Sequence, residues 1–187
     1  IVFPWATSLI IQAGVWKFII DKDYGALNTL LMKIGLISSP VNWTPTPGAY
    51  FAWEIFVGIF VTVPFVTFCV LSGLQSIDNS YYEAATVDGA NYWQKLFKIT
   101  LPLVKSSLTV STVLNIIYVF NSFPIIWPIT KGDPASRTDT LVTYLYKLAF
   151  YKGKSGEAAA VSVIGFLILC ICASVYMVLS LRKEDED

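Results

Sequence analysis

The sequence predicts an all-α membrane protein, a polytopic bundle of transmembrane helices. Of its 187 residues, 55% are hydrophobic and only 14% are charged, a far more apolar balance than soluble domains show. The mean hydropathy of +0.62 agrees with this class. The apolar residues also gather into runs of about twenty or more, the length that a helix needs to cross a bilayer, and the charged residues cluster between these runs.

Four apolar runs are the candidate spans. They cover residues 1–20, 49–74, 103–127 and 158–181. The third run contains Pro124, which should break its helix because proline lacks the backbone N–H and its ring clashes with the preceding turn. We therefore expect a bundle of four spans that forms one domain.

Two polar segments between the runs are expected outside the bilayer. Residues 21–48 contain prolines that interrupt regular structure, and a short helix at the membrane interface is expected over Asn28–Ile37. Residues 128–156 form the second of these loops, in which Thr140–Phe150 should be helical.

The composition excludes several kinds of site. The chain has no histidine, the usual metal ligand and neutral-pH base. Its cysteines, Cys69, Cys170 and Cys172, all lie in apolar runs, so we expect packed or lipid-facing thiols rather than disulfides or metal ligands. Lys and Arg number 13, as do Asp and Glu, so no basic surface indicates nucleic acid. No metal, cofactor or catalytic residue is expected.

An intramembrane enzyme or an ion-coupled transporter would need polar groups that the runs lack. The chain has no Gly-x-Ser-x-Gly nucleophile motif and no paired acids within a span, which disfavours an enzyme. An ion-coupled secondary transporter needs acids near mid-bilayer, and only Glu54 comes close. Because Glu54 lies toward the outer end of its run, we expect a water-exposed carboxylate there rather than a proton relay.

The polar segment of residues 76–102 has strong local signals for helix ends. Ser80 followed by Glu83 is typical of a capping box, so a helix is expected to start at Tyr81. Gly89 suits the C-terminus of that helix, where a left-handed residue without a Cβ ends the last turn.

A second, amphipathic helix is expected after Asn91, which would be its N-cap. Its apolar residues fall on one face and its lysines on another: Trp93, Leu96 and Phe97 on the first, Lys95 and Lys98 on the second. Pro102 then fits the first turn of the following helix. The segment is thus predicted to be a helix, a glycine corner and an amphipathic helix outside the bilayer.

The same segment carries a fixed spacing of residue types. The spacing is Glu83, Ala84 and Ala85, three residues, Gly89, nine residues, and then Ile99, Leu101 and Pro102. It resembles the cytoplasmic EAA loop signature of bacterial ABC importer permeases. Other stretches resemble the carbohydrate-uptake class of these binding-protein-dependent permeases, the maltose and glycerol-3-phosphate type: Pro4–Trp5, Tyr24–Asn28, Pro64–Phe65, Gly73–Gln75 and Thr138–Phe150.

The resemblance implies the ABC type I importer permease fold, whose core has six spans. Four spans of the expected six would be present, and residues 1–187 would be a transmembrane permease domain that lacks its N-terminal pair. The segment of about residues 76–102 would be its cytoplasmic coupling loop. Basic residues are about equally frequent on the two sides and do not fix the orientation, so the cytoplasmic place of the loop rests on the resemblance. The implied location is the bacterial cytoplasmic (inner) membrane.

By the same resemblance, the chain is expected to be one permease subunit of an ATP-driven importer. It would form half of the pathway for a sugar or related solute, with a second homologous permease as its partner. Two ABC ATPase subunits would bind the coupling loops and hydrolyse ATP, so the permease itself is not an enzyme. An extracytoplasmic solute-binding protein would deliver the solute. The alternatives are a permease for a non-sugar solute and, less favoured, an ion-coupled secondary transporter.

The resemblance also assigns two sets of residues. The ATPase-coupling set is Tyr81, Glu83, Ala84, Ala85, Asp88, Gly89, Phe97, Ile99, Leu101 and Pro102. The substrate-pathway set is Thr62, Phe65, Tyr118, Asn121 and Ser122. Amide groups and aromatic faces suit a hydroxylated ligand, but the same side chains also suit packing between the helices of two permeases, and the sequence leaves both readings open.

Overall fold

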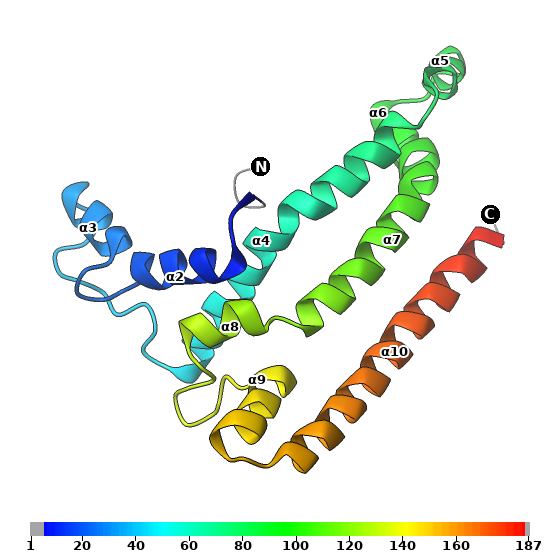
Figure 1. Ribbon diagram of the computed structural model, residues 1–187. Helices are drawn as coiled ribbons and strands as arrows, with labels where there is room; N and C mark the ends of the chain where they lie inside the picture. Colours follow the sequence, from blue (N-terminus) through cyan, green and yellow to red (C-terminus); the bar gives the residue numbers. More distant parts are fainter. Residues whose placement is uncertain (1–5, 186–187) are drawn as a thin grey trace.

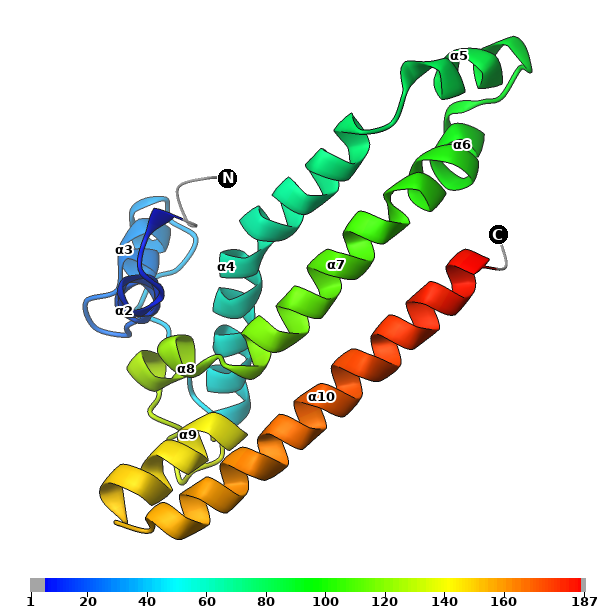
Figure 2. The same ribbon diagram turned by 45° about the vertical axis from the view of Figure 1, so that its right-hand side comes forward.

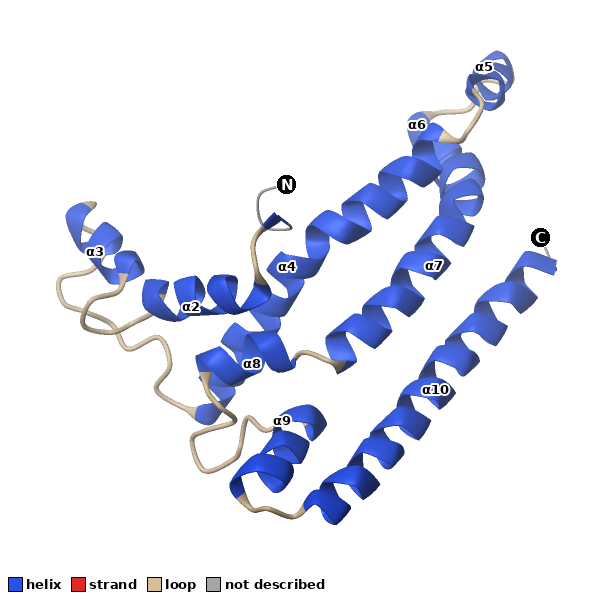
Figure 3. Cartoon of the chain, in the orientation of Figure 1, coloured by secondary structure: helices blue, strands red, loops and turns tan. Residues whose placement is uncertain are grey.

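A computed structural model describes residues 6–185, and these residues are helical with no β-strand (Figure 3). Three of the helices are long and apolar enough to cross a membrane: α4 (Pro47–Gln75), the helix Tyr92–Phe120, and α10 (Ser155–Asp185). They run side by side, and the C-terminal end of α10 lies at the same end of the bundle as α5 (Asn79–Val87) (Figures 1 and 2). The prediction of an all-α bundle is confirmed.

The first expected span is shorter than predicted. Within residues 1–20 the structure has α2 (Leu9–Ile19), an 11-residue helix that covers only about 16 Å at 1.5 Å per residue. Residues 1–5, including Pro4–Trp5, lie outside the described part of the chain. The prediction of four spans is therefore wrong for residues 6–185, which contain three helices of spanning length. The helix α2 lies at a steep angle to α4 and packs mainly on α8 (Phe123–Ile129) (Figures 1 and 2). It also contacts α4, where Ala13 packs with Val57 and Val61.

The third long helix starts earlier than its apolar run. It consists of α6 (Tyr92–Lys95), a π-helical turn (Leu96–Thr100) and α7 (Leu101–Phe120), which follow one another without a break. In the π-helical turn the N–H of Leu101 donates to the carbonyl of Leu96, five residues back. Pro102, which has no N–H to donate, is accommodated directly after this widened turn. The amphipathic helix and the span are thus one rod, which we call the α6–α7 helix.

The α6–α7 helix ends at Phe120, four residues before the proline that was expected to break it. Asn121 leaves the helical conformation (φ −93°, ψ +47°), and α8 begins at Phe123, with Pro124 in its first turn. Pro124 therefore starts a new helix rather than kinking the old one, which agrees with the preference of proline for first turns.

Small side chains allow α4 and α7 to approach closely. Gly73 is buried, and a Cβ at this position would lie 2.6 Å from Oγ of Ser107 and 2.9 Å from its Cβ. On the other side of α7, a hydrogen bond of 2.5 Å joins the hydroxyls of Thr109 and Ser180, which is on α10. Close backbone approach at small residues and hydroxyl pairs between helices are the usual means of association within a bilayer.

The outer loops, at the end of the bundle away from α5, are held by buried polar side chains. Asn28, in α3 (Ala26–Lys33), donates to the carbonyls of Lys22 and Val41 and accepts from the Val41 N–H and from Nε1 of Trp43. It thereby fixes the loop that leads into α4. The expected helix near residues 28–37 is confirmed with slightly different bounds.

The expected helix at 140–150 is also present. It consists of α9 (Leu141–Tyr146) and a second π-helical turn (Lys147–Tyr151), and α9 is started by a capping box between Thr140 and Thr143. A cluster of aromatic rings joins this helix to α8, with the centroids of Trp127 and Tyr146 4.6 Å apart.

Replacing Gly73 with alanine should destabilise the contact between α4 and α7. The added methyl group meets Ser107 too closely, and such overpacking typically costs about 1–3 kcal/mol. The matched control is Gly58→Ala, in the same helix, where no atom of the described residues lies within 4 Å of the new Cβ. Thermal unfolding of the purified protein in detergent measures the effect, and equal midpoint shifts for the two variants would contradict the close approach.

Candidate functional site: an exposed coupling loop and a polar break between helices

The helix α5 begins with a cap that differs from the prediction. The side chain of Asp78 accepts the N–H of Ser80 at 2.8 Å, so Asp78 is the N-cap and the helix starts at Asn79. The expected capping box of Ser80 and Glu83 is wrong, because Asp78 is an equally good cap and lies two residues earlier. The bond from the Ser80 N–H lowers the pKa of the Asp78 carboxyl by stabilising its charged form. Glu83 has no capping role and lies exposed in the middle of α5.

The end of α5 has the predicted left-handed glycine. Gly89 has φ +75°, and its N–H donates to the carbonyl of Thr86, while the N–H of Ala90 donates to that of Ala85 at 2.9 Å. This pair of bonds is the Schellman motif, which satisfies the last carbonyls of a helix. A side chain at Gly89 would meet no atom of the described residues within 4 Å, so the corner is open on its outer side.

The second helix of the loop also starts as predicted. Asn91 accepts the N–H of Gln94, and the side chain of Gln94 accepts the N–H of Asn91, which makes a complete capping box. The rings of Trp93 and Phe97 stack with centroids 6.1 Å apart, and each side chain is more than 60% exposed. The predicted apolar face therefore exists, and much of it lies on the surface.

Two side-chain contacts that the sequence analysis did not find connect α5 to the α6–α7 helix. The hydroxyls of Tyr82 and Thr100 share a hydrogen bond of 3.0 Å, and Nζ of Lys95 donates to Oγ1 of Thr86 at 2.7 Å. Tyr82 and Thr86 are one helical turn apart, so both contacts lie along the same side of α5. They hold α5 at the tip of the α6–α7 helix, where it projects beyond the end of the bundle (Figure 1).

The predicted coupling residues lie together at this end of the molecule, on two helices. Most of them are exposed: Tyr81, Glu83, Ala84, Asp88 and Gly89 on or next to α5, and Phe97, Leu101 and Pro102 on the α6–α7 helix. Ala85 and Ile99 are half-buried. The loop therefore presents a short, exposed helix that includes the small residues Ala84 and Ala85 and that two side-chain hydrogen bonds join to a long rod.

The five predicted pathway residues line two hollows that share a wall between α4 and α7. A hollow of about 140 Å³ is lined by Val61, Thr62, Phe65, Leu114, Asn115 and Tyr118. A smaller one of about 30 Å³ is lined by Thr62, Tyr118, Asn121 and Ser122 among others. The break after Phe120 thus brings Asn121 and Ser122 beside residues of α4.

The polar groups of these hollows differ in what they can offer a ligand. The Thr62 hydroxyl donates to carbonyls of its own helix, and the Asn115 amide donates to the Ser111 carbonyl. Asn121 is exposed, and the Tyr118 side chain is 40% exposed. An amide beside an aromatic face can bind a hydroxylated ligand, and it can equally meet a second helix bundle.

The structure contradicts the prediction that Glu54 is exposed to water. It is buried in α4, only 4% exposed, and accepts a hydrogen bond of 2.5 Å from the Thr130 hydroxyl. The expectation of a water-exposed carboxylate is wrong because α8 folds back onto α4 and its C-terminal end covers Glu54. No sequence pattern indicated this contact, which joins residues 76 positions apart.

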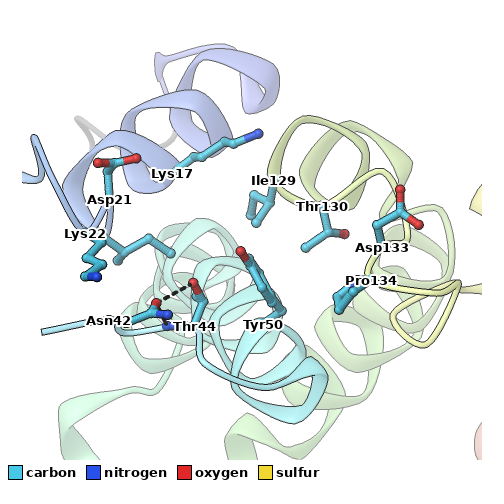
Figure 4. Close-up of a pocket in the computed structure, with 11 residues that line it drawn as sticks. Lys17, Asp21, Lys22, Asn42, Thr44, Tyr50, Ile129, Thr130, Asp133 and Pro134 are labelled. Atoms are coloured by element: carbon cyan, nitrogen blue, oxygen red, sulfur yellow. Dashed lines mark hydrogen bonds between the residues drawn. The ribbon is translucent and has the colours of Figure 1, made fainter.

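A polar pocket of about 410 Å³ lies near Glu54, at the outer end of the bundle (Figure 4). Basic, acidic and neutral polar side chains from three segments of the chain line it: Lys17, Asp21, Lys22, Asn42, Thr44, Tyr50, Thr130 and Asp133. The Asp21 carboxylate accepts the N–H groups of Tyr24 and Asp23, which lowers its pKa. Sequence reasoning missed this pocket because its walls meet only in the folded chain.

An all-helical membrane bundle with an exposed helical loop at one end and a polar break between its long helices has the architecture of a membrane transport component. The chain belongs to the family of binding-protein-dependent transport system inner membrane components, whose sequence pattern matches residues 1–183. The family resemblance drawn from the spacing in residues 76–102 is therefore confirmed.

Relatives agree with this family. The chain is 48% identical over 184 residues to a probable ABC transporter permease protein of Brucella suis, and the match covers 98% of this chain and 64% of that protein. It is 34% identical over 185 residues to the trehalose/maltose transport system permease protein MalF of Thermococcus litoralis, covering 99% of this chain and 62% of the relative. The chain thus spans less than two thirds of the length of these relatives.

A solved structure has the same fold. A chain of a bacterial alginate ABC transporter, crystallised with a periplasmic protein that carries an alginate pentasaccharide, superposes with a TM-score of 0.83 at 24% identity. The superposition covers 97% of this chain and 62% of that chain. At this identity the likeness supports the importer permease fold alone.

Removing the two side-chain links should loosen α5. In a Tyr82→Phe, Lys95→Met double variant, the bonds to Thr100 and Thr86 are lost while the helix caps remain, so the amide protons of α5 should exchange faster with solvent. Hydrogen exchange measured by mass spectrometry checks this, with Tyr81→Phe on the exposed side as control. Unchanged exchange in the double variant would show that the links do not hold α5.

Proposed function

We propose that this chain is part of a permease subunit of an ATP-driven, binding-protein-dependent importer in the bacterial cytoplasmic membrane. The observation that carries the proposal is the coupling loop: a short exposed helix with the EAA spacing, ended by a left-handed glycine and joined to the tip of a long apolar helix. Family membership supports the same function.

The proposed partners follow from the surfaces that the chain leaves open. Large apolar side chains are exposed along α4, α7 and α10, and a second homologous permease would cover part of them while lipid covers the rest. Each of two ABC ATPases would receive one coupling loop on the cytoplasmic side. An extracytoplasmic solute-binding protein would approach the opposite end, which carries the outer loops and the polar pocket. ATP hydrolysis belongs to the ATPases, and the permease carries out no covalent chemistry.

The proposed solute is a sugar or a related hydroxylated molecule. Relatives carry names of this kind, among them the sulfoquinovosyl glycerol transport permease SmoG of Agrobacterium fabrum and the diacetylchitobiose uptake permease DasB of Streptomyces coelicolor. In this chain the solute would pass Thr62, Phe65, Tyr118, Asn121 and Ser122. Their amide and hydroxyl groups match hydroxyls of a sugar, and their rings match its apolar face.

The mechanism that the geometry supports is a lever. Movement of the ATPases would displace α5, and the links from Tyr82 and Lys95 would pass this displacement to the α6–α7 helix. This helix of 29 residues is about 44 Å long and ends at Asn121, in the wall of the smaller hollow. A rigid displacement at the cytoplasmic tip would therefore move the pathway wall and switch the route between its two sides.

Replacing Gly89 with valine should separate folding from coupling. A β-branched residue with positive φ costs about 1–2 kcal/mol, and Gly89→Val should lower thermal stability by that amount. Gly153→Val is the matched control, because Gly153 also has positive φ (+64°) and open surroundings but lies at the outer end. Both variants should lose similar stability, while only Gly89→Val should release the ATPases on co-purification or uncouple ATP hydrolysis from uptake. Normal uptake by the Gly89→Val complex would contradict the coupling role.

Replacing Asn121 with leucine tests the pathway. The change removes an amide without adding charge, so uptake of the solute in reconstituted vesicles should fall about tenfold or more, the effect of losing one or two hydrogen bonds to the solute. Assembly of the complex should be unchanged if Asn121 faces the solute route, because the leucine then meets no partner helix. Loss of assembly with Asn121→Leu would instead indicate a packing role between permeases.

A further inference from the structure

The short helix α8 lies along α4 in a fixed antiparallel register. Glu54 and Thr62 are eight positions apart on α4, and Ser122 and Thr130 are eight positions apart across α8, so each pair spans about 12 Å. Thr130 bonds to Glu54 at one end, and Ser122 shares the smaller hollow with Thr62 at the other. The two helices therefore meet at both ends of α8.

Apolar side chains fill the space between these two ends. Val57 and Val61 of α4 pack with Ile125 and Ile129 of α8, and each of the four is at most 3% exposed. Such packing holds the two helices together, but branched aliphatic side chains tolerate small shifts along a helix better than a directional hydrogen bond does. Ala13 of α2 belongs to the same buried cluster, so α2 also packs on α8. A directional polar contact adds a restraint on the register of α8 along α4 to this packing.

The hydrogen bond between Thr130 and Glu54 can restrain the register of α8 on α4. Oε1 of Glu54 accepts the Thr130 hydroxyl, and Oγ1 of Thr130 in turn accepts the N–H of Gly132 at 3.0 Å and the Thr138 hydroxyl at 3.1 Å. Thr138 is 1% exposed. The other oxygen, Oε2, is buried and finds no donor among residues 6–185, so Thr130 is the one donor to this carboxyl within that range. The Glu54 carboxyl is buried, whereas Thr130 also lines the polar pocket. A second polar contact to α8 comes from α2, where Nζ of Lys17 donates to the Pro128 carbonyl at 3.2 Å.

The N-terminal end of α8 has no comparable side-chain hydrogen bond among the described residues. Ser122 is the N-cap of α8 but its side chain makes no capping hydrogen bond within the described part of the chain, and Asn121 is exposed. The position of this break relative to Thr62 therefore depends on α7, to whose Ile117 carbonyl the Asn121 N–H donates, and on how α8 is held further along.

We propose that Glu54 is a positioning residue of the transport pathway: by binding Thr130 at the far end of α8, it fixes the register of α8 on α4. It thereby holds Asn121 and Ser122 against Thr62 and Tyr118. Glu54 does not touch the solute. The consequence for solute handling rests on the proposed function, whereas the effect on the position of α8 does not.

The test measures the position of α8 directly and without transport. In the full-length protein in lipid nanodiscs, with its native cysteines replaced by serine, spin labels are placed at the exposed Lys131, directly after α8, and at the exposed Ser72 of α4. Electron–electron resonance then gives the distribution of distances between the labels. Thr130→Val removes the hydroxyl but keeps the shape, and it should broaden this distribution.

Three further variants make the measurement specific. Thr130→Ser retains the hydroxyl and should restore the narrow distribution of the parent. Thr67→Val, on α4, is the matched control, because the Thr67 hydroxyl bonds to the Val63 carbonyl of its own helix and to no other group among residues 6–185. If Thr130→Val does not accumulate in the membrane, Glu54→Asp is used instead, since it shortens the side chain while keeping the carboxyl group and should broaden the distribution in the same way.

Uptake in reconstituted vesicles supplies the second readout. At equal amounts of assembled complex, Thr130→Val should raise the apparent KM for the solute about tenfold, as expected when one buried hydrogen bond no longer holds the site, while Thr130→Ser and Thr67→Val should match the parent. A parent-like distance distribution in Thr130→Val, or in Glu54→Asp where that variant replaces it, would overturn the proposal. A broadened distribution with unchanged uptake would keep the register claim but overturn the pathway claim. Absence of ATP-driven uptake in the parent itself would count against the proposed function and leave the distance result standing.

Discussion

The hydrogen bonds between α5 and the α6–α7 helix are the interactions on which the proposed mechanism depends. Without the contacts of Tyr82 with Thr100 and of Lys95 with Thr86, only the chain segments on either side of α5 would hold it. The helix α5 could then move independently of the α6–α7 helix. With them, the exposed corner at Gly89 and the long rod behind it form one body. The π-helical turn and Pro102 lie just behind this joint, where the rod enters its apolar part.

A second link, through α8, continues from the proposed pathway residues to the outer end. The α6–α7 helix stops at Asn121, and α8 runs from there back along α4 to the buried pair Glu54 and Thr130. Non-helical backbone at membrane depth is stable only where protein or a water-filled cavity surrounds it. The break at Asn121 borders the smaller hollow, whose walls include residues of α4, α7 and α8. The non-helical break therefore lies at the position where the proposed solute route would need polar groups.

Much of this could be predicted from the sequence, because the signals are local. Apolar runs of sufficient length predicted the three helices of spanning length in residues 6–185. Gly89 predicted the end of α5 and Asn91 the start of the α6–α7 helix, through backbone chemistry that needs no tertiary contact. The failures have tertiary or competing local causes. Asp78 replaced Ser80 as the cap because two good caps lie two residues apart, and the burial of Glu54 required α8 to fold back over α4. The outer pocket and the bond between Tyr82 and Thr100 likewise join segments whose proximity no periodicity encodes.

The central claim, that α5 enters an ATPase and moves with it, is tested most directly by crosslinking. A cysteine at the exposed Ala84 of α5 is paired with single cysteines in the cleft of the ATPase that co-purifies with the protein, and the disulfide yield is measured with and without nucleotide. The mechanism predicts efficient crosslinking whose yield changes between the ATP-bound and nucleotide-free states, with none from a cysteine at Gly153. No crosslink at any cleft position, or a yield that nucleotide does not change, would contradict it.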